Sequence, residues 1–162
     1  MVGGYGSFNR HRNRRSAILI EFSFVPVNEV CGEIAPHVAR HSREAEDHEA
    51  NVNIDWEAYI SSGLTGLCWA VTARENGKLI GYAVYTIANN PRFKHIVEAT
   101  SDGIFLEKEY RGKVALQKKA AEILKGVGVH EINYILRENS KFGKVLERDG
   151  YSPDYKIWSL KL

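Results

Sequence analysis

Residues 102–126, which read DGIFLEKEYRGKVALQKKAAEILKG, hold the pattern in this sequence that is most directly tied to a chemical task. Positions 103–106 alternate between two faces, as in a β-strand. Beyond the turn at 110–113 apolar residues recur at helical spacing, and Gly126 is placed to end the helix. A strand that turns sharply into a helix presents unpaired backbone N–H groups and the positive end of the helix dipole. The segment therefore predicts a binding site for an anion such as a phosphate.

The rest of the sequence predicts the elements that hold this turn in place. Runs rich in β-branched and aromatic residues predict strands at 17–25, 66–74, 79–88, 95–106, 131–136 and 155–162. Helical spacing predicts helices at 28–49, 55–60, 114–125 and 139–150, the last capped by Asn139, with Pro36 opening a second helix in the first segment or kinking a single one. Asn76-Gly77 between two apolar runs predicts a tight hairpin. This order of elements indicates a mixed α/β domain of the α+β kind.

Length and composition limit the class of protein. With 162 residues, 44% of them apolar, the chain suits one domain at 17–162, preceded by a basic tail at 1–16. No apolar run approaches the ~18–20 residues that cross a bilayer, and the first residues lack the apolar core of a secretory signal. Cys31 and Cys68 lie in no metal-ligand spacing and are too few for a disulfide scaffold. We therefore expect a cytoplasmic protein with no membrane partner.

Two charged features are open to more than one interpretation. A formal net charge of +2 does not indicate nucleic-acid binding by the domain as a whole, but the arginine-rich tail is either a phosphate-contacting arm or a solvated terminus. His37 and His41 are helix neighbours that in principle share a metal, yet the sequence places no third ligand beside them. We expect no metal, and a helix that lines a substrate cleft or is merely solvated.

Two motifs resemble those of the GNAT superfamily of N-acetyltransferases, and the resemblance spans 17–162. Tyr110-Arg111-Gly112-Lys113 resembles the family's Arg-x-x-Gly-x-Gly/Ala turn, whose backbone N–H groups hold the pyrophosphate of acetyl-CoA. Residues 139–151 are similar to the family's Asn-containing helix in the spacing of the Asn, the acidic-basic pair and the Gly-aromatic end. The resemblance implies a mostly antiparallel sheet of six to seven strands with a central splay, flanked by about four helices. A narrower similarity, to acetyltransferase-like proteins encoded by bacteriophages, rests on 55–57, 77–82 and 146–151.

The resemblance also implies a reaction and a set of binding residues. Acetyl-CoA would be the co-substrate and an amine the acceptor, with direct attack in a ternary complex. The residues implied to bind the coenzyme are Phe105, Leu106, Arg111, Gly112, Lys113, Val114, Ala115, Leu116, Asn139 and Phe142. The sequence departs from the family in two places. Val114 and Leu116 stand where the family's turn has small residues, and Leu146 stands where many members have a tyrosine that protonates the leaving thiolate.

Transfer to an amine also requires a base. A free lysine amine has a pKa near 10.4, so roughly one molecule in a thousand is unprotonated at neutral pH. Glu98, Thr100 and Asp102 share a face by strand alternation, on the strand that supplies the acidic base in relatives that use one. Asp102 is the first candidate and Glu98 the second, the alternative being that Asp102 pins the strand end through a hydrogen bond. Tyr134 on the next strand is a further proton-transfer candidate or a packing residue.

Two other functions are left open by the sequence. One is a catalytically reduced GNAT-fold phage protein that acts as an interaction or virion structural component. The other is a small nucleic-acid-binding module that uses the tail. The acceptor, whether a small molecule or a protein, is not specified, and neither is the oligomeric state, a homodimer included. A phage-encoded protein would be found in the host cytoplasm or the virion.

Overall fold

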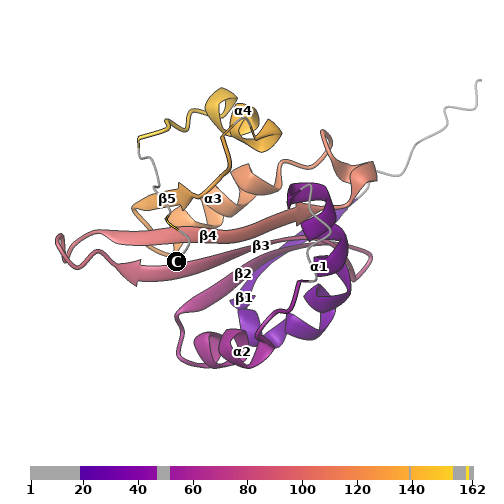
Figure 1. Cartoon of the computed structure of the whole chain (residues 1–162), viewed down its shortest axis with the longest axis horizontal. Coiled ribbons are helices and arrows are strands. Elements are labelled where there is room, and N and C mark those ends of the chain that lie inside the picture. Colours follow the sequence, from indigo (N-terminus) through magenta and orange to yellow (C-terminus); the bar gives the residue numbers. More distant parts are fainter. Residues whose placement is uncertain (1–18, 47–51, 139, 155–159, 161–162) are drawn as a thin grey trace, which may run out of the picture.

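The predicted apolar runs form one five-stranded sheet, of strand order β1-β2-β3-β4-β5, in the part of the chain that the structure describes. The computed structural model describes residues 19–46, 52–138, 140–154 and 160 (Figure 1), so the predicted tail and the predicted strand at 155–162 lie outside it. The strands are β1 (Ile20–Pro26), β2 (Cys68–Glu75), β3 (Lys78–Asn89), β4 (Val97–Leu106) and β5 (Glu131–Tyr134). Neighbours from β1 to β4 are antiparallel, and β5 is parallel to β4.

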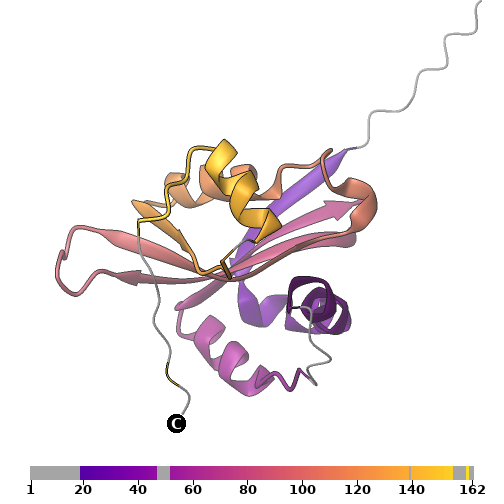
Figure 2. The ribbon, with the colours of Figure 1, turned by 45° about the horizontal axis from the view of Figure 1, so that its top comes forward.

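Helices cover both faces of this sheet (Figures 1 and 2). They are α1 (Cys31–Glu46), α2 (Trp56–Leu64), α3 (Leu116–Gly126) and α4 (Lys141–Arg148), with short 3₁₀ turns η1 (Val27–Glu29) and η2 (Lys108–Tyr110). Helices α1 and α2 lie on one face and α3 and α4 on the other. Helix α3 connects β4 to the parallel strand β5, as expected for a crossover. The predicted fold class, with β4 and β5 as parallel neighbours, is confirmed, although the described sheet has five strands where six to seven were expected.

Several local predictions hold. Asn76 and Gly77 both have positive φ, 51° and 79°, the backbone that a two-residue hairpin requires, and they join β2 to β3. Helix α4 ends as predicted before Gly150, whose φ is 94°. Pro36 lies inside a single helix α1, so the interpretation that it opens a second helix is wrong.

Two helix ends differ from the prediction. Helix α2 continues through Gly63, which is buried so close to Asn28 that an added Cβ would lie 2.4 Å from the Asn28 side-chain oxygen. The glycine permits close packing of α2 on η1, and does not end the helix at 60. The N-cap of α4 is Ser140 rather than Asn139, since the Ser140 hydroxyl accepts from the Phe142 N–H at 3.2 Å. Asn139 itself is outside the described residues.

Strand β4 contains an irregularity that the alternation pattern did not predict. Ser101 is opposite Tyr85 and Gly103 is opposite Val84, so Asp102 is an extra residue in β4, a β-bulge. The bulge reverses the alternation. Asp102 therefore shares a face with Phe105, on the side of α1 and α2, and not with Ile104, which packs toward α3.

Side chains from the two faces form two cores. Val27, Ile34, Tyr82 and Phe105 belong to the core beneath α1 and α2, and Tyr85, Ala99, Leu116 and Leu124 to the core beneath α3. Both are anchored on β3, whose residues alternate between them. The sheet is thus held from both sides at its centre, and its partly covered region lies at β4 and β5.

Asp149 links α3 to α4. Its carboxylate accepts from Gln117 Nε2 at 2.8 Å and lies 3.1 Å from Lys118 Nζ, and its side chain is 2% exposed. The hydrogen bond from Gln117, followed by the interactions with Lys118, lowers the pKa of Asp149 below its ordinary value. These contacts of Asp149 with Gln117 and Lys118 hold the end of α4 against the start of α3.

Substituting Asp149→Asn should therefore lower the midpoint of thermal unfolding at pH 7. A carboxyl whose pKa is lower in the folded state stabilises the fold above its unfolded pKa, and the contribution disappears as the pH falls through the folded value. The difference in midpoint between the two proteins should be constant from about pH 6 to 8 and should shrink as the pH drops below the ordinary value of 3.8. A difference that persists unchanged in acid would show that the ionised carboxylate is not the source of the stabilisation.

Candidate active site

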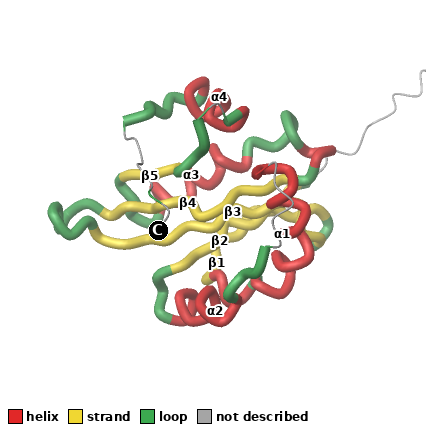
Figure 3. The backbone as a smooth tube through the Cα atoms, in the orientation of Figure 1, coloured by secondary structure: helices red, strands yellow, loops and turns green. Residues whose placement is uncertain are grey.

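Strands β4 and β5 separate partway along their length. Their pairing runs from Glu98 opposite Glu131 to Ser101 opposite Tyr134, whereas β4 continues to Leu106. After Tyr134 the chain leaves the sheet as a loop toward α4 (Figure 3). The backbone of residues 102–106 thus has no strand beside it on the β5 side in the described part of the chain.

An open cleft of about 3380 Å³ lies where the two strands separate. Its lining comes from both separated strands, from the turn 111–117, from α4, and from α1 and α2 on the other face. The volume exceeds the roughly 300–1,000 Å³ of a typical single-ligand pocket. The cleft is therefore larger than one small ligand needs, and it reaches both faces of the sheet.

The turn before α3 places amide donors at one end of this cleft. Gly112 is exposed, with φ of 78°, and a Cβ there would meet nothing within 4 Å. The N–H groups of Lys113 and Val114 close the turn on the Tyr110 carbonyl, at 3.0 and 2.9 Å. Among the described residues no backbone acceptor faces the N–H groups of residues 115–117, which begin α3. These are the amides available to an anion, together with the helix dipole.

The departures from the family's turn have a structural consequence. Leu116 is 1% exposed and packs in the core beneath α3, so its side chain does not project toward an anion at the helix start. Ala115 is exposed and small. Val114 is partly buried and lines the cleft. Of the two large residues in the turn, Val114 and Leu116, only Val114 places a side chain where it can reach a ligand. The backbone amides at the start of α3 are thus left open, and the residues present fit a phosphate.

Arg111, at the start of the turn, lies against α1. Its guanidinium donates to the Glu44 carboxylate and, through Nε, to the Leu106 carbonyl at 2.7 Å. It also stands over the Phe105 ring, with 5.8 Å from Cζ to the ring centre. Phe105 is itself buried among the rings of Tyr82 and His41. Phe105 therefore borders the cleft mainly through its backbone, whereas the half-buried Leu106 lines the cleft beside it.

Asp102 is held by a residue that the sequence did not single out. The Tyr59 hydroxyl, on α2, donates a hydrogen bond to the Asp102 carboxylate. Burial, and then this hydrogen bond, raise the pKa of Tyr59 well above its ordinary value, so Tyr59 remains a donor at every physiological pH. The two residues are 43 positions apart, and the sequence predicted only a helix at 55–60 that contains Tyr59. No local signal could have paired them.

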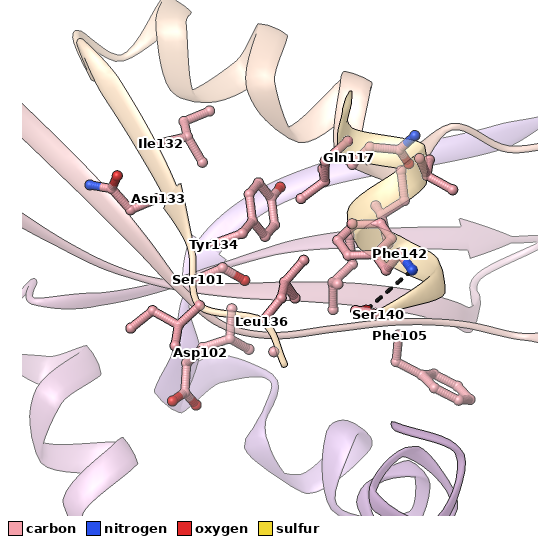
Figure 4. A pocket seen from close by; sticks show the side chains of 18 of the residues that line it. Ser101, Asp102, Phe105, Gln117, Ile132, Asn133, Tyr134, Leu136, Ser140 and Phe142 are labelled. Atoms are coloured by element: carbon pink, nitrogen blue, oxygen red, sulfur yellow. Dashed lines mark hydrogen bonds between the residues drawn. The ribbon is translucent and has the colours of Figure 1, made fainter. Parts of the chain in front are cut away.

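The other two predicted catalytic residues lie apart from Asp102. Glu98 lies two face-sharing positions further back on β4, beyond Thr100, and accepts from the Asn90 side-chain amide. Tyr134 points to the opposite face, toward α3 and α4 (Figure 4). Its hydroxyl is 2.8 Å from that of Tyr85, and burial raises its pKa far above the ordinary value. Tyr134 thus keeps its proton and stands on the other side of the sheet from both carboxylates.

Aromatic rings and α4 close the α3 side of the cleft around Tyr134. Phe142 and Tyr151 meet the Tyr134 ring edge-on, with centroids 5.6 and 5.5 Å away. Phe142, one of the predicted coenzyme-binding residues, lines the cleft with Ser140 (Figure 4). Leu146, at the position of the family's tyrosine, is buried. Tyr134 and Tyr151 are therefore the phenol hydroxyls that line this part of the described structure.

The histidines of α1 take part in polar contacts. His37 Nδ1 is 2.9 Å from Arg40 and 3.3 Å from Glu107, and His41 Nδ1 is 3.0 Å from the Tyr82 hydroxyl. Within residues 19–46, 52–138, 140–154 and 160, no three His, Cys, Asp or Glu side chains gather as they would around a metal ion. The same residues include no helix that is both long and apolar enough to span a membrane.

Comparisons with known proteins identify the family. Residues 33–143 match the model of the acetyltransferase (GNAT) family, and the chain belongs to this family. A search of curated proteins finds no match.

The fold recurs in many solved structures. A ribosomal-protein-alanine N-acetyltransferase from Brucella melitensis biovar Abortus 2308 is similar with a TM-score of 0.66 and 17% identity, over 89% of this chain and 99% of that one. A predicted acetyltransferase from Clostridium acetobutylicum, solved with acetyl-CoA, has a TM-score of 0.68 and 17% identity over 88% and 96%. An aminoglycoside acetyltransferase from an uncultured soil metagenomic sample, in complex with sisomicin, has 0.65 and 10% over 88% and 97%. At these identities the likeness shows the shared fold.

Proposed function

We propose that the protein is an acetyl-CoA-dependent N-acetyltransferase in which an amine acceptor attacks the thioester directly. The observation that carries the proposal is a single cleft that offers anion-binding amides in one part and a carboxylate on the α2 side of the sheet. The amides at the start of α3 open into it at one end, and the Asp102 carboxylate lies on the α2 side. Membership of the acetyltransferase family supports acetyl-CoA as the donor.

The residues of the turn and of α4 would hold the coenzyme. The amides of 115–117 and the exposed Gly112 suit the pyrophosphate, with Lys113 adjacent as a cation. The unpaired edge of β4 at 102–106 offers backbone hydrogen bonds to an extended chain, and Phe142 offers an apolar surface. When bound, acetyl-CoA supplies an activated acetyl group.

Asp102 would accept the proton that the attacking amine must lose. Tyr59 holds one oxygen of the carboxylate by a hydrogen bond, and Asp102 lines the cleft. On the opposite face, Tyr134 keeps its proton and is the candidate to donate a hydrogen bond to the departing thiolate. A thiol with a pKa of about 8.5, like that of cysteine, leaves tolerably without an acid, so the base should matter more than Tyr134.

A panel of amines tests the proposal. Purified protein is mixed with acetyl-CoA and each amine, and release of the free thiol is followed with a thiol-reactive dye. We expect release that depends on both the amine and the protein. Coenzyme binding without thiol release for any amine would support instead the catalytically reduced protein that the sequence left open, whether or not it is encoded by a phage.

A further inference from the structure

The α2 side of the cleft carries carboxylates that lack cationic partners. Asp102 accepts from the Tyr59 hydroxyl and Glu98 from the Asn90 amide, both neutral donors. Glu131, exposed on β5, lines the same cleft. None of the ion pairs formed among the described residues involves any of these three carboxylates.

Two carboxylates at the α1 end of the cleft are neutralised. Glu44 is paired with Arg111, and Glu107 with Arg40 at 2.8 Å. Both pairs lie at the α1 end, beside the phosphate turn. Glu138, Glu147 and Asp154, before, in and after α4, also line the cleft without an ion pair to any described residue. The carboxylates of β4 and β5 that have no counterion in the described part of the chain thus lie away from the two neutralised pairs and from the turn at 111–117.

Glu98 and Glu131 form a like-charged pair across two strands. They are direct neighbours in the parallel register of β4 and β5, and their side chains point to the same face, because the next pair, Ala99 and Ile132, points to the core beneath α3. Like charges directly opposite each other in a sheet are destabilising. A bound cation would relieve this repulsion.

The same side of the cleft also offers aromatic surface. Trp56 and Tyr59 of α2 both line it, and their ring centroids are 5.9 Å apart. Aromatic faces attract alkylammonium groups and cover the carbon chain that joins them. Carboxylates and aromatic rings together form a surface suited to a basic organic molecule rather than to an anion or a neutral sugar.

We infer that the acceptor carries two basic amines: one presented to Asp102 as the nucleophile, and a second that stays protonated against Glu98 and Glu131. The inference rests on the proposed function, whose site it specifies. Asp102 and Glu98 are four residues apart on β4, which spans roughly 10–13 Å once the bulge is allowed for. The acceptor class is thus a linear diamine, polyamine or similarly spaced polyamino compound.

The division of roles between the two amines follows from their protonation. Only the amine at Asp102 must lose its proton, because only that nitrogen forms the new bond to the acetyl carbon while the carbon–sulfur bond breaks. The proton passes to Asp102, and the electron pair of the broken bond leaves on sulfur, which is protonated in turn. The second amine stays charged throughout and contributes binding alone.

Linear diamines from diaminopropane to diaminodecane, each compared with the amino alcohol of equal chain length, test the inference. We expect kcat/KM for diamines to rise with chain length until the second ammonium reaches the glutamates, and there to exceed that of the matched amino alcohol by about tenfold or more. The advantage should disappear in the double variant Glu98→Gln/Glu131→Gln, mainly through KM. Diamines no better than amino alcohols in the unaltered protein would overturn the inference and leave the proposed function standing.

A matched control and a binding measurement separate the two claims. The double variant Glu21→Gln/Glu29→Gln removes the same number of carboxylates from exposed positions outside the cleft, and should keep the preference for diamines. Calorimetric titration of the protein with the best diamine and its amino alcohol measures binding without turnover. A diamine preference in binding that depends on Glu98 and Glu131 supports the charge site even if no amine is acetylated, whereas equal binding of both compounds overturns it.

Discussion

Substituting Gly112→Glu should abolish binding of acetyl-CoA. Gly112 is exposed at the turn, and its φ of 78° directs a side chain into open space at the start of α3. A carboxylate there would face the pyrophosphate, and two unit charges ~5 Å apart repel by about 3 kcal/mol at an effective dielectric constant of ~20. The coenzyme's affinity should fall by a factor of about one hundred or more. The measurement is the thermal shift that acetyl-CoA produces by mass action.

Gly112→Gln is the control for this substitution. Glutamine has nearly the same shape and carries the same left-handed backbone cost, about 1–2 kcal/mol, but no charge. It should therefore retain a measurable thermal shift. If the glutamate variant keeps the full shift, the phosphates do not lie at this turn. If both variants lose it equally, the backbone conformation rather than the charge is responsible.

Substituting Asp102→Asn should lower turnover by about 10²–10⁴-fold at neutral pH and leave coenzyme binding intact. The amide can still accept the hydrogen bond from Tyr59, so α2 should remain in place. What is lost is the group that takes the proton from the amine. The loss should become smaller as the pH rises toward the pKa of the free amine, near 10.4, because the acceptor then deprotonates unaided. A pH series of kcat/KM, with the thermal shift by acetyl-CoA as the binding control, measures both effects.

Normal turnover of Asp102→Asn at neutral pH would show that Asp102 only anchors the bulge of β4 to α2. Glu98, the second candidate, would then be the carboxylate to substitute. A loss of the coenzyme's thermal shift would point the same way, since it would mean that the substitution disturbs the strand that borders the coenzyme. The pH dependence of kcat/KM distinguishes a missing base from a displaced strand. Activity should recover at high pH only if the base is missing, because the amine then deprotonates unaided.

Much of the fold could be predicted because it depends on local patterns. The hairpin at Asn76-Gly77 follows from two residues that tolerate positive φ. The pairing of β4 with β5 follows from a strand-helix-strand order whose connection is long enough for a parallel neighbour. These features are set within short stretches of chain, and the structure reproduces them.

The site could be predicted only in part, because its geometry depends on features without a local signature. The bulge at Asp102 reverses the alternation of β4, and the adjacent Gly103 was the only hint of it. Leu116 could not be assigned to the core rather than to the phosphate turn without the start of α3, which falls at Leu116 and not at Val114. Tyr59 reaches Asp102 only through the packing of α2 against the sheet. Sequence periodicity identifies candidate site residues, but tertiary packing determines which of them come into contact.

Native mass spectrometry of the full chain, first with acetyl-CoA and then with added diamine, tests the central claim most directly. The proposal predicts one coenzyme bound per chain, followed by loss of the acetyl group to the diamine with no acetylated form of the protein at any time, as direct attack requires. Absence of bound coenzyme, or the appearance of an acetylated protein that precedes the acetylated amine, would contradict it.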